Sequence, residues 1–254
     1  MYPQIAIGST VVHTYNLFLL ISLIAAALLI ERQIVFFQVK NKDSLYIRIF
    51  IPVAFFSGFL GSAVSQALAY NGSLRLEDLN AGLTFIGGLF TGFIFLIVFS
   101  MMMKISPYFL MNFFTNPLVL AHAFGKIGCF FAGCCFGRPT GTILGVTFPV
   151  DSFAFLEYGE TAVHPTQLYE SAFLFILLFY LQRRPLKKRF YLYAVMFGVF
   201  RFAIEYLRGG PRGTMLNISF VTPGQIAGLA LAAMGLAIFL HQRSHGNRGD
   251  GSNG

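Results

Sequence analysis

Three short segments of this sequence place charged, imidazole or thiol side chains inside long apolar runs. The first segment holds His122, Lys126 and Cys129. If it is helical, these positions (i, i+4 and i+7) share one face. That face would offer a base candidate, a cation and a thiol. The alternative is that Lys126 extends to the membrane interface and that His122 is a hydrogen-bonded core histidine.

A glycine-rich stretch follows the first segment and leads into Gly137-Arg138-Pro139. The glycine and the proline predict that the helix ends there, near the outer interface. Backbone amides and a bidentate guanidinium at that point would suit a phosphate head group. The alternative for Arg138 is a side chain that reaches solvent without a ligand.

The cysteines of the chain lie close together, at positions 129, 134 and 135. With no partner elsewhere in the chain, a disulfide framework is not indicated. The C-x₄-C-C spacing is only a weak zinc signal, so we expect no metal site and no cofactor. We interpret the cysteines as small buried residues.

The second segment holds Arg201, Glu205 and Arg208, again at i, i+4 and i+7. Pairing within one helix could satisfy such a stripe. Two guanidiniums against one carboxylate nevertheless leave a positive charge, which favours an anionic ligand such as a phosphate. Charged residues inside an apolar span are costly, and they therefore indicate a function.

The third segment reads His164-Pro165-Thr166-Gln167-Leu168-Tyr169-Glu170-Ser171. Either His164 or Thr166 could cap a helix that has Pro165 in its first turn. Glu170 lies within the apolar stretch without a local cation. We therefore expect Lys126 or Arg201, from another helix, to pair with it.

The composition predicts that a membrane bundle positions these segments. Of the 254 residues, 56% are hydrophobic and 11% are charged, whereas soluble domains have about 25% charged residues. The expected fold class is an all-α integral membrane protein with about seven transmembrane helices. The predicted spans are residues 11–30, 49–70, 81–103, 113–135, 166–182, 190–207 and 218–240. We expect one transmembrane domain over residues 1–240 and a disordered polar tail over 241–254.

The basic residues predict the orientation of the bundle. Lys and Arg concentrate in loop 31–48, after the third span, in loop 183–189 and in the tail. Under the positive-inside rule, this pattern places the N-terminus outside and the C-terminus in the cytoplasm. The net charge of +8 therefore indicates membrane orientation and no nucleic-acid partner. The start of the chain lacks a cleavage signal, so we expect an uncleaved first helix.

The segments resemble, in order, the motifs of the bacterial prolipoprotein diacylglyceryl transferase family. The resemblance extends from about Tyr15 to Gln225. The run from Gly125 to Thr140 resembles the family signature G-R-I-G-N-F-x-N-G-E-x-x-G-R-P-T. The other matches are His164 to Glu170 with H-P-[ST]-Q-L-Y-E, Arg201 to Arg208 with R-F-x-x-E-x-x-R, and Gly224-Gln225 with a last G-Q.

The resemblance implies transfer of the diacylglyceryl group of phosphatidylglycerol to a lipobox cysteine of prolipoproteins, with release of glycerol phosphate. It implies a multi-pass protein of the bacterial inner membrane whose site faces the exported side. The implied partners are phosphatidylglycerol, the prolipoprotein lipobox peptide and the bilayer. Lys126 and Arg201 would bind the phosphate, Arg138 and Arg208 would support them, and Glu205 would orient a guanidinium. The substrate-binding residues that it implies are Tyr15, Cys129, Gly137, Arg138, His164, Gln167, Tyr169, Glu170, Glu205, Arg208 and Gln225.

The chain departs from the family pattern at several of these positions. Ile86 stands where the family has the histidine proposed as its base. Lys126 stands for the signature arginine and loses the bidentate fork, and Cys129 and Cys134 stand for Asn and Glu. We therefore hypothesise that His122, one turn before Lys126, is the base. The alternatives are a related transferase with another acceptor, which these changes favour, and a non-catalytic lipid-binding protein.

Overall fold

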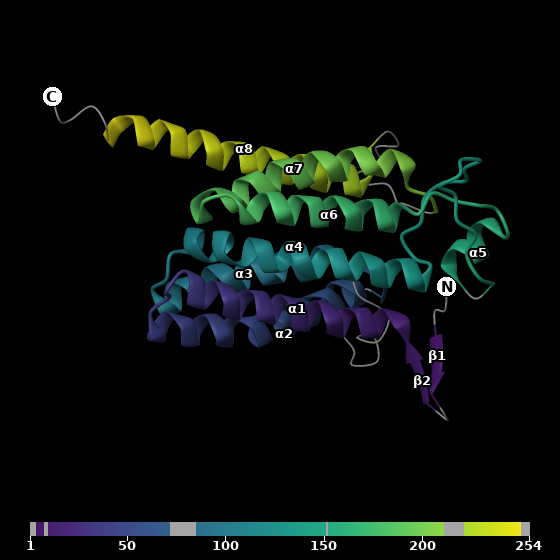
Figure 1. Cartoon of the computed structure of the whole chain (residues 1–254), viewed down its shortest axis with the longest axis horizontal. Coiled ribbons are helices and arrows are strands. Elements are labelled where there is room, and N and C mark those ends of the chain that lie inside the picture. The colour runs from purple at the N-terminus through teal and green to yellow at the C-terminus, as the bar shows by residue number, and fades with distance from the viewer. Residues whose placement is uncertain (1–3, 8–9, 72–84, 151, 211–220, 250–254) are drawn as a thin grey trace. The chain divides into compact units, whose positions relative to one another are not determined.

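The computed structural model describes residues 4–7, 10–71, 85–150, 152–210 and 221–249 (Figure 1). Within these ranges, side chains are described except at 5–12, 55, 65–71, 85–87, 89–90 and 245–249. The chain divides into two compact units, Met1–Leu29 with Phe114–Gly254, and Ile30–Phe113. The sequence predicts one transmembrane domain over residues 1–240, whereas the contacts gather the chain into these two units.

Long apolar runs form helices because a backbone in lipid must satisfy its hydrogen bonds within the segment. Among the described residues, a helix overlaps each predicted span. These helices are α1 (Thr14–Phe36), α2 (Asn41–Asn71), α3 (Phe85–Met103), α4 (Pro107–Ala132), α6 (Thr166–Gln182), α7 (Arg189–Ile204) and α8 (Pro223–Gly249). A short α5 (Phe153–Tyr158) and the 3₁₀ turns Leu186–Lys188 and Glu205–Leu207 lie between them. By length and composition, four helical stretches of the described chain could cross a membrane, Thr14–Phe36, Asn41–Val64, Leu186–Leu207 and Pro223–Ser244.

The N-terminus forms a β-hairpin, which the all-α prediction missed. Its strands are β1 (Gln4–Ile7) and β2 (Thr10–His13), and they pair antiparallel. The predicted first span begins at residue 11, but α1 begins at Thr14. The β-branched residues in Thr10-Val11-Val12 favour a strand over the first turn of a helix.

The loop predicted between the first two spans is shorter in the structure, and the last helix extends into the predicted tail. Only residues 37–40 connect α1 to α2, where the sequence predicts a loop over 31–48. Arg48 Nε lies 2.8 Å from Glu31 Oε1, so an ion pair allows both charged residues to remain helical. The helix α8 continues to Gly249, where the sequence predicts disorder from residue 241. A formed helix extends readily because each added residue gains a hydrogen bond.

In the unit of residues 30–113, α2 packs against α3 through small residues. A Cβ added at Gly88 would lie 3.0 Å from the carbonyl oxygen of Gly58. Farther along the pair, the rings of Phe50 and Phe95 stack with centroids 5.3 Å apart. Glycines allow the backbones to approach, and aromatic rings fill the remaining space.

In the unit of residues 1–29 and 114–254, α4, α6 and α7 form the core that positions the charged segments. Its buried apolar side chains are Val119, Ala123, Leu174, Leu177, Leu178, Leu181, Tyr193 and Phe197. Phe173 of α6 stacks on Phe200 of α7 with centroids 3.9 Å apart. This packing fixes which faces of the three helices turn toward one another.

The helices α7 and α8 lie side by side (Figure 1) and touch through glycines. A Cβ at Gly198 would lie 2.6 Å from the carbonyl oxygen of Gly228 and 2.7 Å from the backbone nitrogen of Ala232. Both of these neighbouring atoms belong to the backbone of α8, which cannot move aside as a flexible side chain can. The contact therefore depends on the absence of a side chain at Gly198.

We expect Gly198→Ala to destabilise the protein by about 1–3 kcal/mol, because the new methyl group must separate the two helices. The matched control is Gly125→Ala in α4, where a Cβ would meet nothing within 4 Å. Alanine there gains up to about 1 kcal/mol of helix propensity. Thermal unfolding in detergent compares the two variants. Equal melting temperatures would contradict the close packing of α7 on α8.

Candidate functional site

The helix α4 carries His122, Lys126 and Cys129, as the spacing predicts. Glu170 of α6 meets the first two: Lys126 Nζ lies 2.9 Å from Glu170 Oε2, and His122 Nε2 lies 3.4 Å from Glu170 Oε1. The Glu170 side chain is 1% exposed, so its charge depends on these partners. The prediction that Lys126 pairs with Glu170 is confirmed.

Glu170 belongs to a buried polar stripe on the otherwise apolar α6. The stripe consists of Thr166, Gln167, Glu170 and Ser171. Thr166 Oγ1 donates to the Cys135 carbonyl oxygen (2.8 Å), Gln167 Nε2 donates to that of Cys134 (2.6 Å), and Ser171 Oγ donates to that of Ala123 (3.0 Å). These bonds attach α6 to α4 and to the chain that follows it.

Thr166 and Ser171 were not predicted to belong to this stripe. Their spacing with Gln167 and Glu170 (i, i+1, i+4 and i+5) is the signal that could have identified a single polar face. The alternative in which His164 or Thr166 caps this helix does not form. Pro165 precedes α6 without a capping side-chain bond, and the Thr166 hydroxyl is used on Cys135 instead.

The helix α4 ends at Ala132, five residues before the predicted end at Gly137. Gly133 has φ +67°, and a Cβ there would lie 2.4 Å from Ser152 Cβ. A glycine is therefore required where the chain reverses against the segment that leads into α5. Cys135 also adopts a positive φ of +61°, which a residue with a side chain rarely does.

After the reversal, Gly137 and Arg138 are held between two other segments. The Gly137 amide donates to the His164 carbonyl oxygen and the Arg138 amide donates to that of Leu207, both at 2.8 Å. The prediction that these backbone amides bind a phosphate is therefore wrong, because both already have partners. The Arg138 side chain is exposed, which agrees with the alternative of a guanidinium that reaches solvent. The bonds do join all three charged segments of the sequence at one place.

We expect Gly137→Ala to separate these segments and to destabilise the protein by about 1–3 kcal/mol, because the new methyl group would collide with backbone atoms of both neighbouring segments. A Cβ at Gly137 would lie 2.6 Å from His164 Cβ and 2.7 Å from the Leu207 carbonyl oxygen. Gly141→Ala is the matched control, because a Cβ there would meet nothing within 4 Å. Thermal unfolding in detergent compares the two variants. Similar melting temperatures in both would contradict a positioning role for this junction.

Arg201 Nη1 lies 2.6 Å from Glu205 Oε2, so the pairing within the helix that the sequence allowed does form. Arg208 does not extend this stripe, because α7 ends at Ile204 and Arg208 is extended after a 3₁₀ turn. Its backbone instead bridges to Gly137. Nε and Nη1 of Arg208 are buried and have no hydrogen-bond partner among the described residues.

The N-terminus of α8 packs against the Arg201–Glu205 ion pair. A Cβ at Gly224 would lie 2.6 Å from Arg201 Nη2 and 2.7 Å from Glu205 Oε2. The buried Gln225 accepts a hydrogen bond at its side-chain Oε1 from the backbone amide of Thr222 (3.0 Å). The backbone amide of Gln225 donates to Thr222 Oγ1 (3.2 Å). This is a capping box, which gives Gln225 a structural role at the start of the helix.

Three further predicted site residues, Tyr15, His164 and Tyr169, lie in the same unit of residues 1–29 and 114–254. His164 Nδ1 and Tyr169 Oη are 3.3 Å apart. Tyr15 of α1 lies beside α4, where a Cβ at Gly128 would be 3.4 Å from Tyr15 Cδ2. The side chain of Ile86, at the position of the family histidine, lies outside the described residues. Buried carboxylate, cations, imidazole and thiols thus gather in one unit, an arrangement that suits an anionic lipid head group and a proton transfer.

Comparisons with known proteins agree with this arrangement. The family described as prolipoprotein diacylglyceryl transferase matches residues 4–241. A phosphatidylglycerol--prolipoprotein diacylglyceryl transferase of Clostridium tetani is 35% identical over 65% of this chain and 66% of that protein. A second such protein, from Clostridium perfringens, is 27% identical over 83% and 84% of the two chains. A third, from Stenotrophomonas maltophilia, is 27% identical over 94% and 90%. The chain belongs to the prolipoprotein diacylglyceryl transferase family.

Proposed function

We propose that this chain transfers the diacylglyceryl group of phosphatidylglycerol to the sulfur of a lipobox cysteine in prolipoproteins, releasing glycerol phosphate. Such a reaction is a step of lipoprotein maturation. Membership of a transferase family over residues 4–241 supports it, as do relatives that are named for this reaction. The proposed substrates are therefore a phospholipid in the bilayer and a peptide with a thiol.

The structural observation that carries the proposal is the buried guanidinium of Arg208. Its Nε and Nη1 are buried without a hydrogen-bond partner among the described residues. Unsatisfied buried donors are costly, and a ligand that pairs with them recovers that cost. The planar fork of an arginine matches the oxygens of a phosphate. We infer that Arg208 binds the phosphate of the lipid.

Lys126 and Arg201 complete the proposed phosphate site. Their positive charges would stabilise the negative charge that develops on glycerol phosphate as it leaves. Glu205 holds the Arg201 guanidinium at 2.6 Å and would orient it. Glu170 holds the Lys126 ammonium at 2.9 Å in the same way. A carboxylate thus fixes each of these two cations before the lipid binds.

His122 is the proposed base for the acceptor thiol. Its Nε2 lies 3.4 Å from Glu170 Oε1, and such a carboxylate stabilises the imidazolium that forms when the proton is taken. We expect His122→Ala to slow transfer about 100-fold or more. Labelled lipid and a lipobox peptide provide the measurement. A folded His122→Ala protein that transfers at the normal rate would exclude this role.

We propose seven membrane spans, with the N-terminus outside and the C-terminus in the cytoplasm. The helices α1, α2, α3, α4, α6, α7 and α8 are the candidate spans. The five basic residues between 183 and 189 support a cytoplasmic turn between α6 and α7. The loop between α4 and α6 would then face the exported side, where the prolipoprotein cysteine arrives. Fusions of a side-sensitive reporter after residue 186 and after residue 249 test this orientation, and an exported signal at either position would contradict it.

The activity is tested with purified protein, phosphatidylglycerol labelled in its diacylglyceryl group, and a lipobox peptide. We expect label on the peptide and an equal amount of released glycerol phosphate. Glycerol phosphate without labelled peptide would replace the proposed acceptor with a different one. Neither product, from protein that remains folded, would contradict a transferase function.

A further inference from the structure

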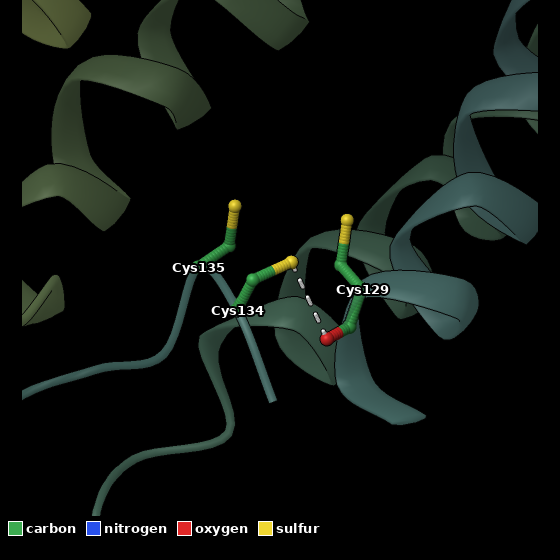
Figure 2. A group of neighbouring side chains, drawn as sticks. All are labelled: Cys129, Cys134 and Cys135. Carbon is green, nitrogen blue, oxygen red and sulfur yellow. Dashed lines mark hydrogen bonds between the residues drawn. The ribbon is translucent and has the colours of Figure 1, made fainter. Parts of the chain in front are cut away.

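Three thiols gather at the end of α4. The Sγ atoms of Cys129, Cys134 and Cys135 all lie within 4.8 Å of one another. Figure 2 shows that Cys129 comes from the helix and the other two from the chain that follows it. All three are free thiols, and Cys134 Sγ contacts the carbonyl oxygen of Cys129 at 3.7 Å. The fold thus makes one cluster of residues that the sequence suggested were merely small and buried.

Side chains of α6 form hydrogen bonds to the backbone of two of these cysteines. Gln167 Nε2 donates to the Cys134 carbonyl oxygen at 2.6 Å, and Thr166 Oγ1 donates to that of Cys135 at 2.8 Å. Cys135 is kept at φ +61°, a conformation that costs about 1–3 kcal/mol and persists only where neighbours enforce it. Hydrogen bonds that fix ligand-bearing segments in this way are typical of metal sites.

A cation precedes the cluster on the same helix, since Lys126 lies three positions before Cys129 on α4. A positive neighbour favours thiolates, and the thiolate is the form that binds metal. Three thiolates and one divalent cation have a net charge of −1, which one such cation can balance.

We propose that Cys129, Cys134 and Cys135 bind Zn²⁺ as thiolates and leave its fourth coordination position open. Zinc bonds to thiolates are about 2.3 Å long, so the three sulfurs need to be about 4 Å apart. Their present spacing within 4.8 Å requires only small rotations of the side chains. Three protein ligands with one open position are the arrangement of catalytic zinc, whereas structural zinc has four.

If the chain has the proposed function, the acceptor cysteine would occupy the open position. A thiol that binds zinc would lose its proton more readily, so the metal would assist His122, the proposed base, in generating the nucleophile. The sulfur then bonds to the terminal glyceryl carbon as the bond from that carbon to the phosphate oxygen breaks. The electron pair leaves with glycerol phosphate, which also ends with the thiol proton. The step needs no oxidant or reductant.

Metal content of the full-length protein, purified in detergent under reducing conditions and equilibrated with Zn²⁺, tests the site. We expect equimolar zinc in the wild type. Cys129→Ser, Cys134→Ser and Cys135→Ser should each weaken binding by more than about 100-fold, because changes outside the ligand set alone cost 10–100-fold. Ala132→Ser is the matched control, since it alters the same turn and keeps all three thiols. It should bind zinc as the wild type does.

Two measurements on the wild-type protein test the metal site without variants, in case a cysteine variant fails to fold. Co²⁺ in place of zinc should give a thiolate-to-metal absorption band that changes with a lipobox peptide containing cysteine and not with its serine analogue. Zinc should also protect all three thiols from a maleimide. Absence of bound zinc, a disulfide within the cluster, or binding of Cu⁺ alone would overturn the proposal.

The failures of the two proposals are distinguishable. Zinc bound through the three thiols with no lipidated peptide from labelled phosphatidylglycerol would contradict the proposed function and leave the metal site standing. Normal transfer by the zinc-free cysteine variants would overturn the role of the metal in thiol activation. It would leave the transferase function standing.

Discussion

Lys126→Met is expected to lower diacylglyceryl transfer by about 100–1,000-fold, the usual cost of losing one preorganised group that stabilises developing negative charge. It is also expected to reduce stability by up to about 3–5 kcal/mol, because Glu170 would keep a buried charge with only His122 as a partner. Transfer rate and thermal unfolding, measured on the same purified protein, test both effects. Lys126 is therefore expected to affect activity and fold together.

Two further variants separate the charge of Lys126 from its structure. Lys126→Arg keeps the charge and should recover most of the stability and part of the rate. Lys104→Met, at an exposed lysine of the other unit, should change neither quantity. Wild-type transfer by Lys126→Met would remove Lys126 from the phosphate site. An unchanged melting temperature would contradict the buried pair with Glu170.

Arg208→Met is expected to lower transfer about 100-fold and to leave stability unchanged or slightly raised. The Nε and Nη1 of this guanidinium have no partner among the described residues, so the folded protein loses no hydrogen bond from them. Replacing an unsatisfied buried polar group with an apolar side chain relieves its desolvation cost. Arg208→Met is thus expected to lower the transfer rate alone, whereas Lys126→Met is expected to lower both the transfer rate and the stability.

The measurement for Arg208 is the dependence of transfer rate on phosphatidylglycerol concentration, together with the melting temperature. Arg243→Met, at an exposed arginine of α8, is the control for loss of one positive charge. A large loss of stability in Arg208→Met would indicate that the guanidinium supports the fold. A normal rate would exclude it from lipid binding.

The sequence predicted the helices better than their ends. Apolar length located a helix at each predicted span, because lipid leaves the backbone no other way to satisfy its hydrogen bonds, but it did not predict the short α5. The ends depend on contacts that no short window contains. The helix α4 stops at Ala132 because Gly133 reverses against Ser152, a residue far along the chain. The hairpin at the N-terminus was hidden by a composition that favoured a span.

Within the site, spacing predicted relations along one helix and missed those between segments. The stripe of His122 and Lys126 on α4, and the pairing of Lys126 with Glu170, followed from periodicity and from the cost of a buried charge, whereas the contact of His122 with Glu170 was not predicted. Arg208 shows the opposite case. Its i+7 spacing from Arg201 suggested one stripe, but the helix ends first and the backbone turns to pair with Gly137.

The spacing of the cysteines in the sequence does not reveal that their thiols lie close together in the structure. Cys129 and Cys135 are six positions apart, and their approach depends on a positive φ at Gly133 and at Cys135 itself. The hydrogen bonds from α6 that hold this turn come from Gln167, 33 positions after Cys134, and from Thr166, 31 positions after Cys135. The spacing alone gave only a weak zinc signal. In the folded chain the three Sγ atoms lie within 4.8 Å of one another.

The mass of a lipobox peptide, after incubation with the purified protein and phosphatidylglycerol, tests the proposed transfer directly. Diacylglyceryl transfer predicts a peptide heavier by one diacylglyceryl group, attached through a thioether at cysteine. A peptide with serine at that position should remain unmodified, and Arg208→Met should reduce the product about 100-fold at equal times. An unmodified cysteine peptide, from folded protein in a bilayer that contains phosphatidylglycerol, would contradict the account.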